Sequence, residues 1–151
     1  IDDLKESFPD FTFTTDIIVG FPGESLDDFS ETLDVVKRVK FAKVHAFPFS
    51  VRPGTRAERM SGHIDADVIA KRRVELSKAS EKASYLLREK YLGKTLNVLV
   101  EDTDSLRDGY MQGYSEHFIL VSFPKENVRK NDIVSVKIKE NHPDGLVGEV
   151  V

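Results

Sequence analysis

The stretch that decides the fold is Thr15-Asp16-Ile17-Ile18-Val19-Gly20-Phe21-Pro22-Gly23-Glu24-Ser25. Its first half is a nearly continuous apolar run, which is typical of a strand buried on both faces. Gly20 and Pro22 end that run. Ser25 then predicts the N-cap of a helix, with Asp27 and Asp28 placed favourably against the positive end of the helix dipole. The stretch therefore predicts a strand, a tight turn and a helix in succession.

The residues that follow extend this pattern into a larger unit. Apolar residues recur at helical spacing and predict one buried helix face: Leu26, Phe29, Leu33, Val36 and Val39. A second strand is predicted at Lys43-Val44-His45-Ala46-Phe47-Pro48-Phe49-Ser50. Strand, helix and strand in this order indicate a parallel pair of an α/β fold. Two parallel strands bury too little surface to be stable alone, so we expect a piece of a larger barrel or sheet.

The second half of the chain has a different pattern, with one long helix followed by short strands. A long helix is predicted from about residue 65 to residue 91, and Gly93 ends it. Its basic residues are expected on an exposed face that contacts solvent or an RNA backbone: Lys71, Arg72, Arg73, Lys78, Lys82, Arg88 and Lys90. Five short segments follow, at residues 96–101, 109–114, 117–121, 132–138 and 145–151, and predict a small β-barrel similar to an oligonucleotide-binding fold. We expect two domains, residues 1–93 and residues 94–151.

Composition limits the chemistry that the chain performs by itself. Of its 151 residues, 40% are hydrophobic and 32% are charged, as in ordinary globular proteins, and no apolar run is long enough for a membrane span. The absence of cysteine excludes disulfides, a thiol nucleophile and any iron–sulfur site ligated by this chain. The four histidines have no metal-ligand spacing, and we predict no metal site. The formal net charge of -4 argues against indiscriminate polyanion binding, so an RNA partner requires a local basic face.

The stretch at residues 15–25 resembles the methylthiotransferase family of radical S-adenosylmethionine enzymes. The resemblance continues at Phe49-Ser50-Val51-Arg52-Pro53-Gly54-Thr55-Arg56-Ala57, through the basic helix, and into the β domain, which looks like a TRAM domain. It implies an α/β fragment of the partial TIM barrel of these enzymes followed by an all-β, five-stranded TRAM barrel. Residues 44–50 look closest to the branch that acts on N6-threonylcarbamoyladenosine of tRNA. The branches that act on N6-isopentenyladenosine or on a ribosomal protein stay as alternatives, as does a stand-alone RNA-binding or structural module.

The resemblance also implies cofactors and partners. The full-length enzyme is expected to bind S-adenosylmethionine and two 4Fe–4S clusters, whose cysteine ligands would lie upstream of this chain. It would place a methylthio group on an adenosine beside the anticodon of tRNA, in the cytoplasm. Because the chain begins without Met and holds no cysteine, we expect it to lack the N-terminal half of its polypeptide and to be inactive alone.

Candidate cofactor contacts lie where the first strand passes into its turn and where the second strand ends, because ligands of α/β proteins usually bind at the carboxyl ends of strands. By resemblance to related enzymes, the cofactor-side residues are Ile18, Gly20, Pro22, Gly23, Glu24, Pro48, Phe49 and Ser50. Alternation places His45, Phe47 and Phe49 on one face of the second strand, with Phe47 and Phe49 expected in the core. No catalytic residue is expected in the chain itself.

Candidate substrate contacts lie farther along the chain. Arg52 follows the second strand, and its guanidinium is suited to bind a carboxylate or a phosphate at the mouth of the site, with Thr55 close by. In the β domain the candidate RNA contacts are Arg107, Lys125, Arg129 and Lys130. Tyr110, Tyr114 and Phe118 are candidates for stacking on bases, although we expect most of these rings in the core.

Overall fold

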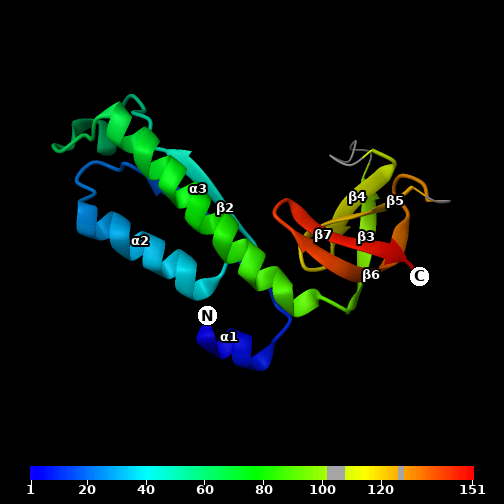
Figure 1. The fold of residues 1–151 in the computed structure, drawn as a ribbon. Coiled ribbons are helices and arrows are strands. Elements are labelled where there is room, and N and C mark those ends of the chain that lie inside the picture. Colours follow the sequence, from blue (N-terminus) through cyan, green and yellow to red (C-terminus); the bar gives the residue numbers. More distant parts are fainter. Residues whose placement is uncertain (102–107, 126–127) are drawn as a thin grey trace. The chain divides into compact units, whose positions relative to one another are not determined.

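The computed structural model describes residues 1–101, 108–125 and 128–151 (Figure 1). Helices and strands follow in the order α1 (Asp2–Ser7), β1 (Thr14–Val19), α2 (Leu26–Val39), β2 (Lys43–Pro48), η1 (Ala57–Arg59), α3 (Ala66–Arg88), η2 (Glu89–Tyr91), β3 (Thr95–Glu101), β4 (Tyr110–Ser115), β5 (Leu120–Pro124), β6 (Ile133–His142) and β7 (Gly145–Val150). They form two compact units, one of residues 13–84 and one of residues 1–12 together with residues 85–151. No described helix has the length and apolar character that crossing a membrane requires.

The first unit contains the predicted strand–helix–strand arrangement. β1 and β2 pair in parallel, with Asp16 opposite His45 and Ile18 opposite Phe47. The alternate residues of both strands pack against a core contributed by α2 and α3, which includes Phe29, Leu33, Val36, Val39, Leu76 and Ala83. The helices therefore cover one face of the two-stranded sheet, and side chains on the other face are available to line a site.

α2 begins as the sequence predicts. Ser25 accepts a hydrogen bond from the backbone N–H of Asp28, and the Asp28 carboxylate accepts one from the backbone N–H of Ser25. This reciprocal capping box satisfies two backbone donors that the first helical turn leaves without partners. The expected apolar stripe is wrong at Leu26, which is 75% exposed, so the buried stripe begins one turn later at Phe29.

Two basic residues of α3 correct the expectation of an exposed basic face. Arg72 and Arg88 are only 7% and 6% exposed. Arg72 pairs with Glu24, and Arg88 donates to Asn141 and to the backbone carbonyls of His142 and Pro143. Burial of a charged group is tolerated where such partners replace water. Periodicity alone did not separate these two arginines from their solvated neighbours.

The second unit is built on a closed barrel in the order β3-β4-β5-β7-β6, as the sequence predicted for the β domain. All neighbours are antiparallel except β5 and β7. The interior is filled by alternating strand residues and Tyr91, among them Leu96, Val98, Val100, Val121, Phe123, Val136, Ile138 and Leu146. The third strand, predicted at residues 117–121, lies instead at Leu120–Pro124, because Phe118 adopts a left-handed backbone conformation with φ 57° in the preceding turn.

Residues 9–12 form a strap that binds to the barrel unit. The Asp10 carboxylate pairs with Lys94 at 3.0 Å, and its backbone carbonyl accepts from the Tyr91 hydroxyl at 3.2 Å. Thr12 donates its hydroxyl to the backbone carbonyl of His117 at 2.7 Å. Burial raises the pKa of the Tyr91 hydroxyl well above its usual value, so this group stays a hydrogen-bond donor at physiological pH. Neither the strap nor α1 was predicted from the sequence.

Candidate functional site

A cavity of about 530 Å³ opens at the carboxyl ends of β1 and β2. Its volume falls within the range of about 300–1,000 Å³ found for small-molecule sites. The wall is largely apolar, with one carboxylate and one guanidinium at its margin. Its lining residues are Asp16, Ile18, Phe21, Phe47, Pro48, Phe49, Ser50, Arg52, Thr55 and Ala57. The structure thus brings together six of the residues that the sequence singled out, namely Ile18, Pro48, Phe49, Ser50, Arg52 and Thr55.

Aromatic rings make up much of the cavity wall. Phe21 and Phe49 meet edge to face, with ring centroids 5.3 Å apart, and Phe47 stacks on His45 at 6.5 Å. Phe47 is 50% exposed and Ile18 is 54% exposed, so the expectation that Phe47 lies in a core is wrong for the described chain. These exposed apolar surfaces on one sheet face are suited to a flat, partly apolar ligand.

The turn between β1 and α2 has a backbone that hydrogen bonds and close packing hold in place next to this wall. Gly20 has φ 81°, and a side chain there would collide with Ile69 of α3, so only glycine fits. The Glu24 carboxylate accepts from the backbone N–H of Gly20 at 2.9 Å and pairs with Arg72, which also donates to the Glu24 carbonyl. The backbone N–H of Gly23 donates to the Gly62 carbonyl at 2.9 Å.

Four of the predicted cofactor-side residues therefore belong to the turn and not to the cavity lining: Gly20, Pro22, Gly23 and Glu24. Gly20 and Pro22 are buried, and Glu24 is directed at protein groups. Their role toward a cofactor stays a prediction. The contacts that the structure describes for them hold the backbone between Val19 and Ser25.

The loop after β2 is closed by its own hydrogen bonds. The Thr55 hydroxyl donates to the Arg52 carbonyl at 2.8 Å, and Glu58 accepts from the backbone N–H of Gly54 at 2.7 Å. Within the described part of the chain, no carboxylate forms an ion pair with the Arg52 guanidinium. The loop thus fixes the backbone of Arg52, which lines the cavity, and a guanidinium there is suited to bind a ligand carboxylate or phosphate.

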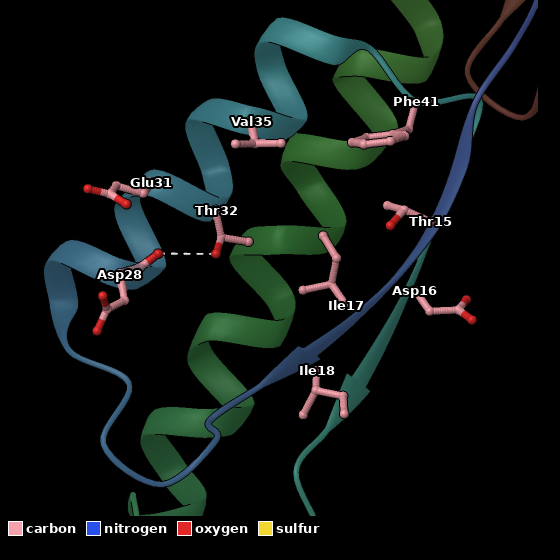
Figure 2. Close-up of a pocket in the computed structure, with 9 residues that line it drawn as sticks. All are labelled: Thr15, Asp16, Ile17, Ile18, Asp28, Glu31, Thr32, Val35 and Phe41. Carbon is pink, nitrogen blue, oxygen red and sulfur yellow. Dashed lines mark hydrogen bonds between the residues drawn. The ribbon is translucent and has the colours of Figure 1, made fainter. Parts of the chain in front are cut away.

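A second cavity of about 500 Å³ runs along β1 and α2, and Figure 2 shows its lining. Ile17 and Asp16 point to opposite sides of β1 in this view, as alternation requires. Asp16 and Ile18 line both cavities. The sequence did not single out Asp16 as a site residue, although its position two residues before Ile18 places it on the same strand face.

The predicted RNA contacts lie in the barrel unit. Lys125 follows β5 and is exposed, and Arg129 and Lys130 are exposed in the turn that leads into β6. Arg107 lies outside the described residues. Among the residues that the structure describes, no group of three His, Asp or Glu side chains is placed to hold a metal ion.

Comparison with known proteins gives one domain match and several relatives. A sequence model of the TRAM domain matches residues 89–151. The whole chain is 40% identical to the threonylcarbamoyladenosine tRNA methylthiotransferase of Chlamydia pneumoniae, of which it covers 35%. It is 37% identical, over 99% of its length, to the tRNA-2-methylthio-N(6)-dimethylallyladenosine synthase of Streptomyces griseus, of which it covers 30%.

A third relative is named for a protein substrate instead of a tRNA. The chain is 37% identical, over 98% of its length, to the ribosomal protein uS12 methylthiotransferase of Clostridioides difficile, and it covers 34% of that protein. The chain spans about a third of the length of the curated relatives it matches. The three relatives are thus nearly equally similar to the chain and are named for three different substrates.

Proposed function

We propose that this chain, whose residues 89–151 match the TRAM domain and whose whole length is similar to methylthiotransferases, forms the cofactor-side wall and the RNA-binding domain of a longer radical S-adenosylmethionine enzyme. The observation that carries the proposal is the cavity at the carboxyl ends of β1 and β2. The unit of residues 13–84 would be part of a larger barrel, since parallel sheets are normally extended and covered on both faces.

The residues of the cavity fit S-adenosylmethionine. Ile18 and Phe47 would lie against the adenine ring, because their exposed apolar surfaces share one sheet face. Asp16 carries a carboxylate on the same sheet face and would bind the ammonium group of the cofactor, which leaves Arg52 for the substrate. Bound S-adenosylmethionine would supply a radical precursor and a methyl group.

The two 4Fe–4S clusters do not fit this chain. Iron–sulfur clusters are held by cysteine thiolates, and the 151 residues contain no cysteine. Cluster binding is therefore assigned to the remainder of the full-length protein, and this chain contributes binding and orientation only.

For the substrate we propose the N6-threonylcarbamoyladenosine of tRNA beside the anticodon, with the enzyme acting in the cytoplasm. Support comes from the strand at residues 44–50 and from the relative in Chlamydia pneumoniae. An adenosine with an N6-isopentenyl group and a ribosomal protein are the alternatives, because relatives named for such substrates match almost as well. Arg52 favours the first, because threonylcarbamoyladenosine carries a carboxylate that an isopentenyl group lacks.

The test is made on the full-length protein with Arg52→Ala. We expect a large loss of methylthiolated adenosine, measured by mass spectrometry of tRNA nucleosides, while the visible absorption of both clusters is unchanged. Arg56→Ala, an exposed arginine of the same loop that does not line the cavity, is the matched control. Wild-type turnover by Arg52→Ala would contradict the role of Arg52, and the nucleoside that gains mass identifies the substrate.

Binding of the cofactor is measured separately from turnover. In equilibrium dialysis of the full-length protein, the Ile18→Asp variant should no longer bind S-adenosylmethionine, because a carboxylate would replace the apolar surface of the cavity wall. Leu26→Asp, at a more exposed apolar position outside the cavity, should bind as the wild type does. If Ile18→Asp and Leu26→Asp bound S-adenosylmethionine with equal affinity, the proposed cofactor site would be contradicted.

A further inference from the structure

The outer face of the barrel carries an apolar row that crosses four neighbouring strands. Ile133 of β6 is paired with Leu99 of β3, Leu99 with Tyr114 of β4, and Tyr114 with Leu120 of β5. Their strand neighbours, such as Val98 and Val121, are fully buried inside the barrel, so alternation directs the row outward. We call these four residues the apolar row.

Two members of the apolar row are exposed to solvent, and Tyr114 and Leu120 are half-buried. Ile133 is 74% exposed and Leu99 is 47% exposed. Single exposed apolar residues are common, but a contiguous set on one sheet face marks an interaction site. The row is therefore a candidate interaction surface.

Phe118 extends the row with a second aromatic ring. Its ring stacks on that of Tyr114, with centroids 5.0 Å apart and planes 20° from parallel, and Phe118 is 50% exposed. The backbone of Phe118 has φ 57°, a conformation that is costly for a bulky residue and tends to occur at functional sites. The backbone N–H of Phe118 donates to the Ser115 carbonyl at 2.9 Å, which fixes this turn.

Polar groups flank the apolar row on both sides, and they include two carboxylates, Glu101 beside Gln112 and Glu116 beside Asn97. Gln112 is paired with Ser122 on one side, and Asn97 is paired with Ser135 on the other, where the Ser135 hydroxyl donates to the Asn97 amide oxygen at 3.2 Å. Amides and hydroxyls can bind the edges of bases whose faces stack on the row. Arg129 and Lys130 are exposed in the turn that leads into Ile133, where they are placed to contact phosphates.

We propose that the apolar row with Phe118 is a stacking platform for unpaired RNA bases. The inference rests on the proposed function, because that function makes RNA the partner of the barrel. RNA is favoured over a protein segment by the open aromatic pair, by the amide and hydroxyl groups on either side, and by the use of this sheet face for oligonucleotides in related small barrels.

The deciding variant is Phe118→Gly in the full-length protein. Glycine adopts φ 57° without strain, so the turn and the barrel should remain folded while the exposed ring is lost. We expect the affinity for a fluorescently labelled anticodon stem-loop RNA to fall roughly tenfold, with an unchanged or higher urea midpoint. Leu99→Ala should also weaken binding, and Leu92→Ala, at a leucine of 45% exposure outside the row, is its matched control.

Three results overturn the platform: no RNA binding by the wild-type protein, equal affinity for a fully paired duplex, or wild-type affinity of both Phe118→Gly and Leu99→Ala. A loss of binding to ribosomal protein uS12 in these variants, with RNA binding intact, would assign the row to a protein instead. The full-length enzyme separates this proposal from the proposed function. If the full-length Phe118→Gly variant modifies tRNA with an unchanged KM for tRNA, the platform alone is rejected. If the wild-type enzyme modifies no tRNA, the proposed function is rejected.

Discussion

Glu24 and Arg72 form the best-shielded ion pair that the structure describes. Their side chains are 12% and 8% exposed, and the carboxylate also accepts from the backbone N–H of Gly20. Arg72 additionally lies over the ring of Phe29 at 5.3 Å. The pair therefore joins α3 to the turn that carries the cavity wall.

Arg72→Met should destabilise the chain by roughly 3–5 kcal/mol, because it leaves the buried Glu24 carboxylate without its counter-charge. Urea unfolding measures the loss. Arg73→Met, at the exposed neighbouring position, should change stability by less than about 0.5 kcal/mol. The double variant Arg72→Met with Glu24→Gln should recover part of the loss, since a neutral amide still accepts from Gly20. Equal losses at positions 72 and 73 would contradict this account.

Individual site residues were predictable where strand alternation and turn position determine them. Ile18 and Pro48 were named by resemblance and Arg52 from its place after the second strand; the structure brings the three to one cavity, and their roles there stay predictions. Arg72 was not predictable, because its partner is 48 residues away in sequence and helical periodicity treats it like Arg73. Asp16 was missed because a single carboxylate in a strand has no motif of its own.

The start of α2 depends on the hydrogen bonds between Ser25 and Asp28. These bonds lower the pKa of the Asp28 carboxyl, mainly through the Ser25 side chain. Because the folded pKa lies below the unfolded one, the contribution of Asp28 is complete above the usual Asp pKa of about 3.9 and is lost as the pH falls below it.

Ser25→Ala should cost about 1 kcal/mol through loss of the cap and should raise the pKa of Asp28 toward its usual value. NMR titration of the Asp28 carboxyl, together with urea unfolding at neutral pH and near pH 3, measures both effects. Ser30→Ala, an exposed serine within α2, is the control and should be neutral or slightly stabilising, since alanine is the better helix former. An unshifted Asp28 titration in Ser25→Ala would show that the capping box does not set this pKa.

Elements with strong local signals were predicted well, and the misplaced ones depend on tertiary contacts. The start of α2 and the parallel pair follow from capping and apolar runs. β5 was placed too early, because the sequence near Phe118 alternates like a strand while the chain turns there. The strap at residues 9–12 has no regular pattern, and its position comes from Lys94, Tyr91 and His117 far along the chain.

The two units have separate hydrophobic cores that share no residue. The closed barrel buries its own interior, whereas the two-stranded sheet leaves Ile18 and Phe47 half exposed. The incomplete cover of the two-stranded sheet was predictable from the small number of parallel strands, but the sequence could not reveal which surface of the barrel is left apolar.

The isolated chain should bind no iron–sulfur cluster. After anaerobic reconstitution with iron and sulfide, we expect no broad absorption near 400 nm, roughly the region where such clusters absorb, because no thiolate is present to ligate iron. The full-length protein treated in parallel is the positive control. A stoichiometric cluster on the isolated chain would require ligands other than cysteine and would overturn the division of roles proposed above.

Arg88 has a practical consequence for dissecting this protein. The TRAM match begins at residue 89, yet Arg88 donates to the carbonyls of His142 and Pro143 in the β6–β7 turn. A barrel excised at that homology boundary would lose this guanidinium and, with residues 9–12, the acceptor of the Tyr91 hydroxyl. The boundary at which sequences can be recognised is thus not the boundary of the compact unit, which begins at Tyr85 and also includes residues 1–12.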